Sequence, residues 1–210
     1  MAEDLVKALA DLEEKKALQI VKDRLDAGED PAGMLDDCRK AMEIVGKKFS
    51  NGDYFIPDLV YAGEILTQIN EIVKPKLKGK SEVKRMGKVV LGTVAGDIHD
   101  IGLNIVDFML DMSGFEVYNL GIDQPPKNFV DKIRETGASI VGLSGFLTLA
   151  FDSMKETVEA IKTAGLRDKV KVMIGGGQID EQVKEYTGAD AYGQDAMAAV
   201  TLAKKWIGAR

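Results

Sequence analysis

The sequence has very little of the two residue types from which proteins most often build metal sites. Its 210 residues include one cysteine, Cys38, and one histidine, His99. A single thiol excludes an internal disulfide framework. One cysteine and one histidine, with no CxxC or HExxH motif, also argue against a zinc site made only of protein nitrogen and sulfur ligands.

Long apolar runs and an excess of positive charge are also missing. No apolar run approaches the roughly 18 residues that a membrane-spanning helix needs. The N-terminal stretch MAEDLVKALADLEEKK is acidic and amphipathic, unlike a secretory signal. The net charge is -6, whereas nucleic-acid binding requires a basic surface. We therefore expect a cytoplasmic protein that binds neither nucleic acid nor membrane.

The first 78 residues carry only helical periodicity. Apolar residues recur there at spacings of three and four, without a strand-like run. Asp30-Pro31 is typical of an N-cap followed by the first helical residue, and Asn51-Gly52 is a turn signal. We expect residues 1–78 to form a helical cap domain of about four helices, if the last helical region is broken.

The pattern changes after a polar, glycine-containing stretch that we interpret as an interdomain linker at residues 79–88. Short β-rich runs then alternate with helical segments over residues 89–210, which predicts βα units and a parallel sheet. The fold class is α/β, with a Rossmann-like, flavodoxin-like five-stranded sheet of order 2-1-3-4-5. Strands are expected at 88–94, 115–121, 138–144, 171–177 and 189–193, and helices at 101–112, 125–137, 151–165, 180–187 and 195–208.

The segment GDIHDIG, residues 96–102, follows the first predicted strand and contains the only histidine. In such sheets, ligands bind beyond the carboxyl ends of the strands, between strands 1 and 3. Asp97 can accept a hydrogen bond from one imidazole nitrogen of His99 and leave the other nitrogen free for a metal. The plain alternative is a solvated loop histidine.

Two other kinds of site are conceivable for this segment. Asp97 and Asp100 could bind Mg²⁺ through oxygen atoms alone. A nucleotide site of the Rossmann type would need GxGxxG, and GDIHDIG lacks the middle glycine. A site with one histidine makes most sense if the metal brings its other ligands with it, as in a macrocycle.

Three motifs together resemble a known family. Asp97-x-His99-x-x-Gly102 resembles the DxHxxG signature of cobalamin-binding domains, and the later SGFLT and GG elements, at residues 144–148 and 175–176, resemble its SxL segment and glycine pair. The stretch MEIVGKKFSNGDYFIPDLVYAGEIL resembles the helical cap next to the corrinoid domain of methionine synthase. The resemblance covers almost the whole chain and is closest to the corrinoid proteins of anaerobic methyltransferase systems.

The resemblance implies a cofactor, cobalamin or a related corrinoid, bound base-off and His-on. It implies that His99 is the lower axial ligand of cobalt and that Asp97 holds its imidazole. Phe146 stands where the family usually has leucine, and Ala150 where methionine synthase has a serine that extends the Asp–His relay. The cofactor-binding residues that it implies are Gly96, Asp97, Ile98, His99, Asp100, Ile101, Gly102, Ser144, Phe146, Leu147, Thr148, Gly175, Gly176, Tyr192, Gly193 and Asp195, with Phe49 and Ile56 of the cap.

The resemblance also implies a methyl carrier that is not catalytic alone. It would shuttle a methyl group on cobalt from a substrate-specific methyltransferase to a second methyltransferase, which acts on tetrahydrofolate or coenzyme M. The donor would be a methoxylated aromatic, a methylamine, a betaine or methanol, and a reductive activator is a further expected partner. The alternatives are a subunit of a corrinoid-dependent mutase, a cobalamin-sensing regulator and a corrin-free signalling domain.

Overall fold

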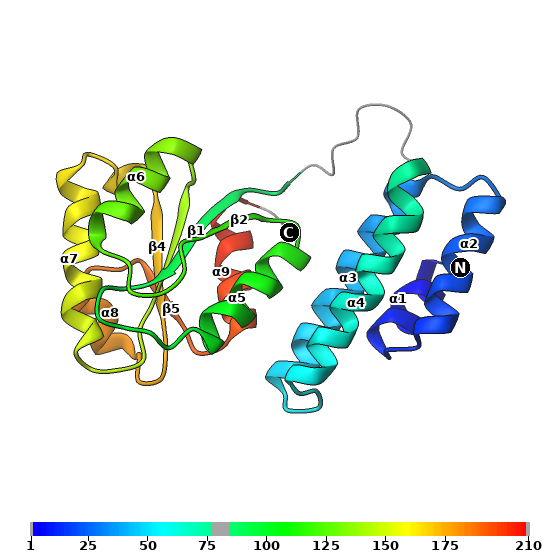
Figure 1. Cartoon of the computed structure of the whole chain (residues 1–210), viewed down its shortest axis with the longest axis horizontal. Coiled ribbons are helices and arrows are strands. Elements are labelled where there is room, and N and C mark those ends of the chain that lie inside the picture. The colour runs from blue at the N-terminus through cyan, green and yellow to red at the C-terminus, as the bar shows by residue number, and fades with distance from the viewer. Residues whose placement is uncertain (1, 77–84, 209–210) are drawn as a thin grey trace. The chain divides into compact units, whose positions relative to one another are not determined.

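The computed structural model describes residues 2–76 and 85–208, which fall into two compact units, Met1–Lys84 and Arg85–Arg210 (Figure 1). Each unit is described by itself. Within the described ranges, no helix combines the length and the apolar character that crossing a membrane requires.

The first unit is entirely helical. The predicted number of about four helices is confirmed. The break in the helical pattern that we expected near the end of this unit instead lies between the first two helices. Leu12 adopts a left-handed backbone with φ of 59°, and its N–H bonds back to the Leu9 carbonyl, which ends the first helix. The elements are α1 (Ala2–Ala10), α2 (Glu14–Asp26), α3 (Pro31–Ser50), α4 (Ile56–Val73) and the 3₁₀ turn η1 (Lys74–Lys76).

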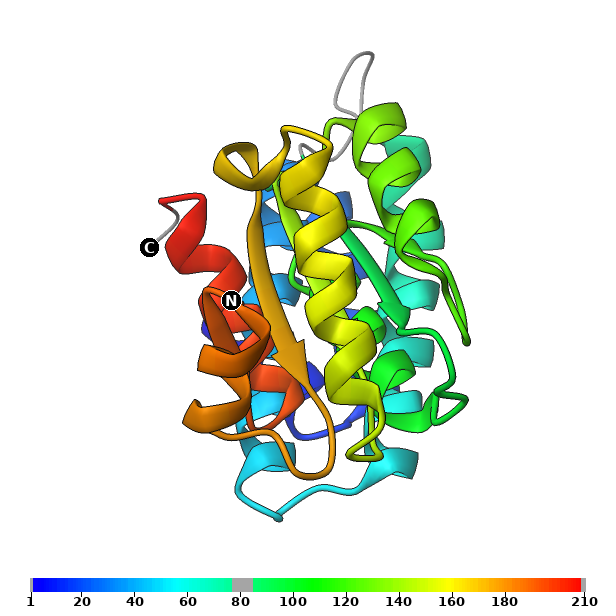
Figure 2. The ribbon, with the colours of Figure 1, turned by 90° about the vertical axis from the view of Figure 1, so that its left-hand side faces the viewer.

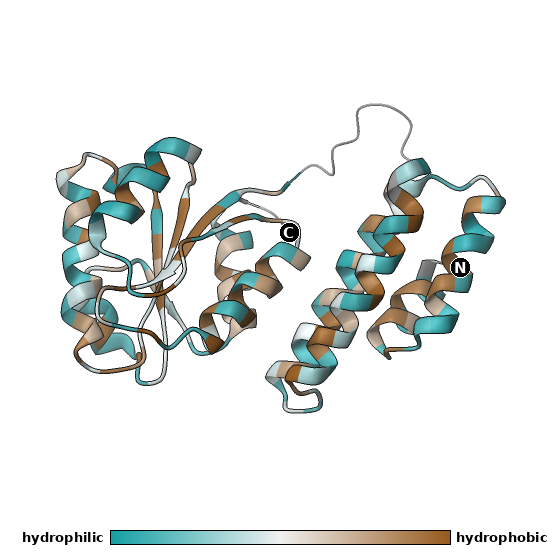
Figure 3. Ribbon diagram, in the orientation of Figure 1, coloured by the Kyte–Doolittle hydropathy of each residue, from teal (hydrophilic) through white to brown (hydrophobic). Residues whose placement is uncertain are grey.

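The apolar faces of these helices form a core of their own. Asp30 caps α3 as its sequence predicts, because its side chain accepts a hydrogen bond from the Ala32 N–H at 3.2 Å. Apolar and polar residues alternate around the helices in Figure 3, as expected for amphipathic helices. The large side chains that this core buries completely include Leu5, Leu9, Met34, Met42, Ile65 and Ile69.

The second unit contains one five-stranded sheet in which every neighbouring pair is parallel. Its order is β2-β1-β3-β4-β5, so the predicted order is confirmed. The three central strands are almost wholly buried, which agrees with their continuous apolar runs. The strands are β1 (Lys88–Thr93), β2 (Glu116–Asn119), β3 (Ile140–Ser144), β4 (Lys171–Gly175) and β5 (Ala191–Gly193).

Helices cover both faces of this sheet. Figures 1 and 2 show α6, α7 and α8 on one face and α5 and α9 on the other. All five parallel strands therefore end at one edge of a three-layer unit, where the loops after β1 and β3 meet. The helices are α5 (Ile101–Met112), α6 (Pro126–Thr136), α7 (Ala150–Thr163), α8 (Glu181–Thr187) and α9 (Ala196–Trp206), with a 3₁₀ turn η2 (Arg167–Lys169) before β4.

The predicted linker at residues 79–88 lies partly outside the described residues, since these resume at Arg85. The first described residues after this gap already make hydrogen bonds within the second unit. The Arg85 guanidinium donates to the Phe115 carbonyl at 2.8 Å, and the Met86 N–H donates to the Gly114 carbonyl at 2.8 Å.

Candidate functional site

The loop between β1 and α5, which carries His99, is held by polar contacts beneath it. The Thr93 hydroxyl is buried, donates to the Asp97 carbonyl and accepts from the Asp123 N–H at 2.8 Å. Asp123, whose backbone is left-handed, in turn accepts from the Gly96 N–H at 2.7 Å. Sequence reasoning missed Thr93 and Asp123. A polar residue closing an apolar strand was a signal for Thr93, whereas only the fold brings Asp123 to this loop.

Asp97 links the loop after β1 to the loop after β3. Its side chain is only 1% exposed. One carboxylate oxygen, Oδ1, accepts from the His99 N–H at 2.9 Å and lies 3.3 Å from Nδ1 of the His99 ring. The other oxygen, Oδ2, accepts from the N–H groups of Phe146 at 2.7 Å and of Leu147 at 3.4 Å. Three of the residues predicted for the site, from two separate motifs, therefore converge on this carboxylate.

The electrostatics of the pair favour one arrangement of protons. Burial alone would raise the pKa of Asp97, but the hydrogen bonds from the Phe146, His99 and Leu147 N–H groups and from the His99 ring outweigh it and lower that pKa. An ionised Asp97 only accepts hydrogen bonds, so a neutral His99 ring carries its proton on Nδ1. The lone pair then lies on Nε2, which is the nitrogen that remains for a metal.

The surface around His99 is apolar and open. The His99 side chain is 45% exposed. Gly102, at the start of α5, also faces free space, since an added Cβ would meet no atom of the chain within 4 Å. The large apolar side chains exposed on the loops after β1, β2 and β3 and at the start of α5 are Ile98, Ile101, Ile122, Phe146, Leu147 and Leu149. Exposed apolar side chains gathered in this way are typical of a binding surface, and they suit a flat, largely apolar ligand.

The glycines after β4 serve the chain's own packing. Gly176 has φ of 144°, and an added Cβ would lie 1.8 Å from the Gly145 carbonyl oxygen. At the next residue, Gly177, an added Cβ would lie 2.5 Å from the Phe146 ring. The resemblance implies Gly175 and Gly176 as cofactor-binding residues, whereas Gly177 was not predicted for the site.

The remaining predicted residues are more dispersed. Ser144 ends β3 beside Thr93, and Tyr192 packs half-buried against the core beneath α6–α8. Asp195 caps α9 by accepting from the Ala198 N–H at 2.7 Å. Gly193 ends β5, and Asp100 and Thr148 are exposed. Phe49, half-buried, and Ile56, exposed, belong to the first unit.

The arrangement does not favour Mg²⁺ binding by Asp97 and Asp100. Both carboxylate oxygens of Asp97 already accept hydrogen bonds, and Asp100 is exposed and bonded to Asn104. Across residues 2–76 and 85–208, no three histidine, cysteine, aspartate or glutamate side chains gather closely enough to hold a metal ion. A metal at His99 would receive one protein ligand.

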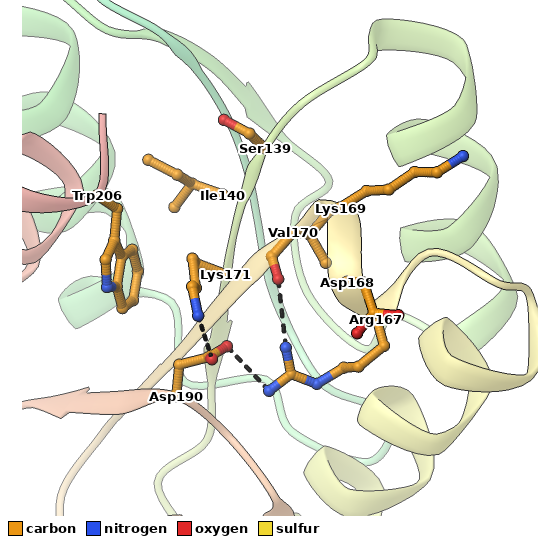
Figure 4. Close-up of a pocket in the computed structure, with 9 residues that line it drawn as sticks. All are labelled: Ser139, Ile140, Arg167, Asp168, Lys169, Val170, Lys171, Asp190 and Trp206. Carbon is orange, nitrogen blue, oxygen red and sulfur yellow. Dashed lines mark hydrogen bonds and ion pairs between the residues drawn. The ribbon is translucent and has the colours of Figure 1, made fainter. Parts of the chain in front are cut away.

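A pocket of about 620 Å³ lies at the opposite edge of the sheet, where β3 and β4 begin (Figure 4). Asp190, which lines the pocket, forms ion pairs with Arg167 at 2.9 Å and with Lys171 at 3.0 Å. Its carboxylate also accepts a hydrogen bond from the Val172 N–H at 2.8 Å. These contacts tie η2 and β4 to the start of β5. The pocket lies at the amino ends of the strands and is therefore remote from His99.

Comparison with protein families gives two matches that together span both units. One model, described as a B12 binding domain, matches residues 87–201. A second model with the same description matches residues 1–74.

Individual relatives agree with these matches. The trimethylamine corrinoid protein 1 of Methanosarcina acetivorans is 38% identical over 196 residues, which are 92% of this chain and 91% of the relative. The dimethylamine corrinoid protein 1 of Methanosarcina mazei is 37% identical over 179 residues, 85% of this chain and 83% of the relative. A crystal structure of a novel cobalamin-binding protein from Desulfitobacterium hafniense has a TM-score of 0.84 and 42% identity and covers 98% of both chains.

Proposed function

The chain belongs to the B12-binding family of corrinoid proteins, and from this premise we propose that it passes a methyl group from a methylamine-specific methyltransferase to a second methyltransferase. Its cofactor is a corrinoid, and its role is that of a methyl carrier that works with methyltransferase partners. The donor, the acceptor and the residues that hold the cofactor are the parts that we propose.

The Asp97–His99 pair is the observation that carries the proposal. His99 is half-exposed in an apolar surface, with Nδ1 turned toward a buried, ionised carboxylate and Nε2 left for a metal. We assign His99 as the lower ligand of the corrinoid cobalt and Asp97 as the residue that orients it. A carboxylate behind a ligating imidazole fixes the tautomer and increases the basicity of the ligand.

The residues around the Asp97–His99 pair also suit a corrinoid. A bound corrinoid supplies a cobalt ion that can accept a methyl group and pass it on. The exposed Ile98, Ile101, Leu147 and Leu149 can cover the apolar underside of a macrocycle. The open space at Gly102 is where we place the nucleotide tail of the cofactor.

Asp97 lacks the serine partner that extends the Asp–His relay in methionine synthase. Ala150 carries only a methyl group and therefore offers Asp97 no hydroxyl, and Asp97 is bonded to backbone N–H groups and to His99. In this chain, Asp97 acts as a fixed, ionised acceptor that holds the proton on Nδ1.

The proposed partners follow from the relatives and from the resemblance. The curated relatives are named for trimethylamine and dimethylamine, so we propose a methylated amine as the donor class. The proposed acceptor enzyme methylates tetrahydrofolate or coenzyme M, and a reductive activator restores oxidised cofactor. Residues 49 and 56 of the helical unit are proposed to shield the upper face of the cofactor.

Loading the purified protein with cobalamin tests the site. We expect the protein to keep the colour of the cofactor through desalting, and His99→Ala to change the visible spectrum of the Co(III) form to that of a cofactor without an imidazole ligand. The unfolding of each apo-protein, followed by Trp206 fluorescence, checks that the variant is folded. An unchanged spectrum in folded His99→Ala protein would refute His99 as the ligand.

A second experiment tests the donor class. The loaded, reduced protein is mixed in turn with methyltransferases specific for methylamines, methanol, betaines and methoxylated aromatics, each with its substrate. We expect methylation of the cofactor only with a methylamine enzyme. Methylation by the methanol, betaine or aromatic enzyme alone would contradict the proposed donor.

A further inference from the structure

The hydrogen bond between Asp97 and the His99 ring is a long one. The distance from Nδ1 to Oδ1 is 3.3 Å, beyond the 2.7–3.2 Å usual for such bonds. The His99 side chain is also 45% exposed, so packing restrains it little on its open side. A ligand that must present Nε2 in one direction needs a second restraint.

The Phe146 ring supplies a contact of this kind. Its centroid lies 4.8 Å from the centroid of the imidazole, and the two planes are tilted by 32°. This separation falls within the range in which aromatic rings attract one another. The same residue donates its backbone N–H to Oδ2 of Asp97 at 2.7 Å, the shortest of the four contacts to that carboxylate. Phe146 thus touches both members of the pair.

The position of the Phe146 ring depends on Gly177. An added Cβ at this residue would lie 2.5 Å from Cε2 and 2.7 Å from Cδ2 of the ring. A side chain at position 177 would therefore require the Phe146 ring to shift from its present position. The loop after β4 therefore lies against the Cδ2–Cε2 edge of the ring.

We propose that Phe146 is a positioning residue for the His99 ligand, and that Gly177 provides the space in which its ring is held. The inference rests on the proposed function, since it assigns Phe146 a role in presenting Nε2 to the cobalt. The backbone of Phe146 orients Asp97, and its ring restrains the imidazole about its last side-chain bond. The ring and the carboxylate together pre-organise the ligand before the cofactor binds.

The first test uses the apo-protein and needs no cofactor. His99 is the only histidine, so its ring protons give isolated signals in a protein labelled with ¹³C- and ¹⁵N-histidine. We expect these signals to lie upfield because of the Phe146 ring and to show nuclear Overhauser contacts to it. Phe146→Leu and Gly177→Ala should both move them toward random-coil positions, whereas Phe151→Leu, a change of the same kind in the core-packed part of α7, should not. Unmoved signals in Phe146→Leu would overturn the inference.

The second test measures ligation in the loaded protein. The protein is labelled with ¹⁵N-histidine, so that in the Co(II) form electron paramagnetic resonance separates cofactor coordinated by His99 from cofactor that is not. We expect Phe146→Leu to lower the ratio of coordinated to uncoordinated cofactor by about three- to tenfold, which is the effect of losing one aromatic contact. Phe146→Tyr should keep the ratio of the parent protein. Equal ratios in Phe146→Leu and the parent protein would overturn the role of Phe146 while leaving His99 as the ligand. A parent protein without ligation by ¹⁵N would refute the proposed assignment of His99 as the ligand, and the inference with it.

Discussion

Replacing Asp97 with asparagine perturbs the contacts of a single buried side chain without changing its shape. The carboxylate accepts hydrogen bonds on both oxygens, from His99 on one and from Phe146 and Leu147 on the other. Asparagine has one acceptor oxygen and one NH₂ group, so in either orientation its NH₂ faces backbone N–H donors. At a side chain that is 1% exposed, water cannot relieve this mismatch.

The size of the effect follows from these contacts. A buried donor that loses its acceptor costs about 1–3 kcal/mol, and at least one of the short N–H bonds, 2.7 or 2.9 Å, is lost. Burying a neutral amide in place of a charge recovers part of this cost. We expect the free energy of unfolding of the second unit to fall by about 2 kcal/mol.

Urea unfolding of the apo-protein, followed by tryptophan fluorescence, measures this difference. Trp206, the only tryptophan, lies in α9, so the signal reports on the second unit. Asp131→Asn is the matched control, since Asp131 is an exposed residue of α6 and should change stability by less than about 0.5 kcal/mol. If Asp97→Asn is as stable as the control, the hydrogen bonds do not hold Asp97 as described.

Three further outcomes are expected. Burial raises the pKa of Asp190, but the Val172 N–H, Lys171 and Arg167 more than offset this and lower it. The stability that Asp190 contributes is therefore present above its unfolded pKa, about 3.9, and is lost as the pH falls through the lower folded value. Asp190→Asn should flatten the fall in urea stability below about pH 4, and an unchanged pH profile would contradict this. Gly176→Ala should destabilise the second unit by more than about 3 kcal/mol, because the added Cβ would clash with the Gly145 carbonyl. If the variant unfolds at the same urea concentration as the parent protein, measured by tryptophan fluorescence, the clash does not exist. Gly102→Ala should leave the apo-protein as stable or stabilise it by about 0.5–1 kcal/mol, yet weaken retention of cobalamin on desalting. Full retention would show that the tail does not pass Gly102.

Much of the fold was predictable because its signals are local. Five β-rich runs, separated by amphipathic segments, indicate the parallel sheet, and the observed order is the predicted one. The helical unit shows where local signals are weaker. Leu12 ends α1 in a left-handed backbone that a leucine rarely adopts, so the sequence did not indicate a break there.

The candidate site was predictable only in part. Asp97 and His99 are two residues apart, so both lie on one short loop. The Asp97 side chain accepts a hydrogen bond from the His99 N–H, which is a local turn that the sequence can indicate. The partners from other loops depend on tertiary contacts. Asp123 accepts a hydrogen bond from the loop of His99, although it lies 24 residues further along the chain. Gly177 leaves space for the ring of Phe146, which lies 31 residues before it. No local sequence pattern indicates contacts between residues so far apart in the chain.

The assignment of His99 to cobalt has one direct test, because labelled histidine marks a single residue of this chain. The protein is prepared with ¹⁵N-histidine and with ¹⁴N-histidine, each form is loaded with the same unlabelled corrinoid, and the Co(II) state is examined by electron paramagnetic resonance. We predict that the nitrogen splitting changes from a triplet to a doublet when ¹⁵N replaces ¹⁴N in His99. A triplet in both preparations would mean that the cofactor keeps its own base on cobalt, and would contradict the account.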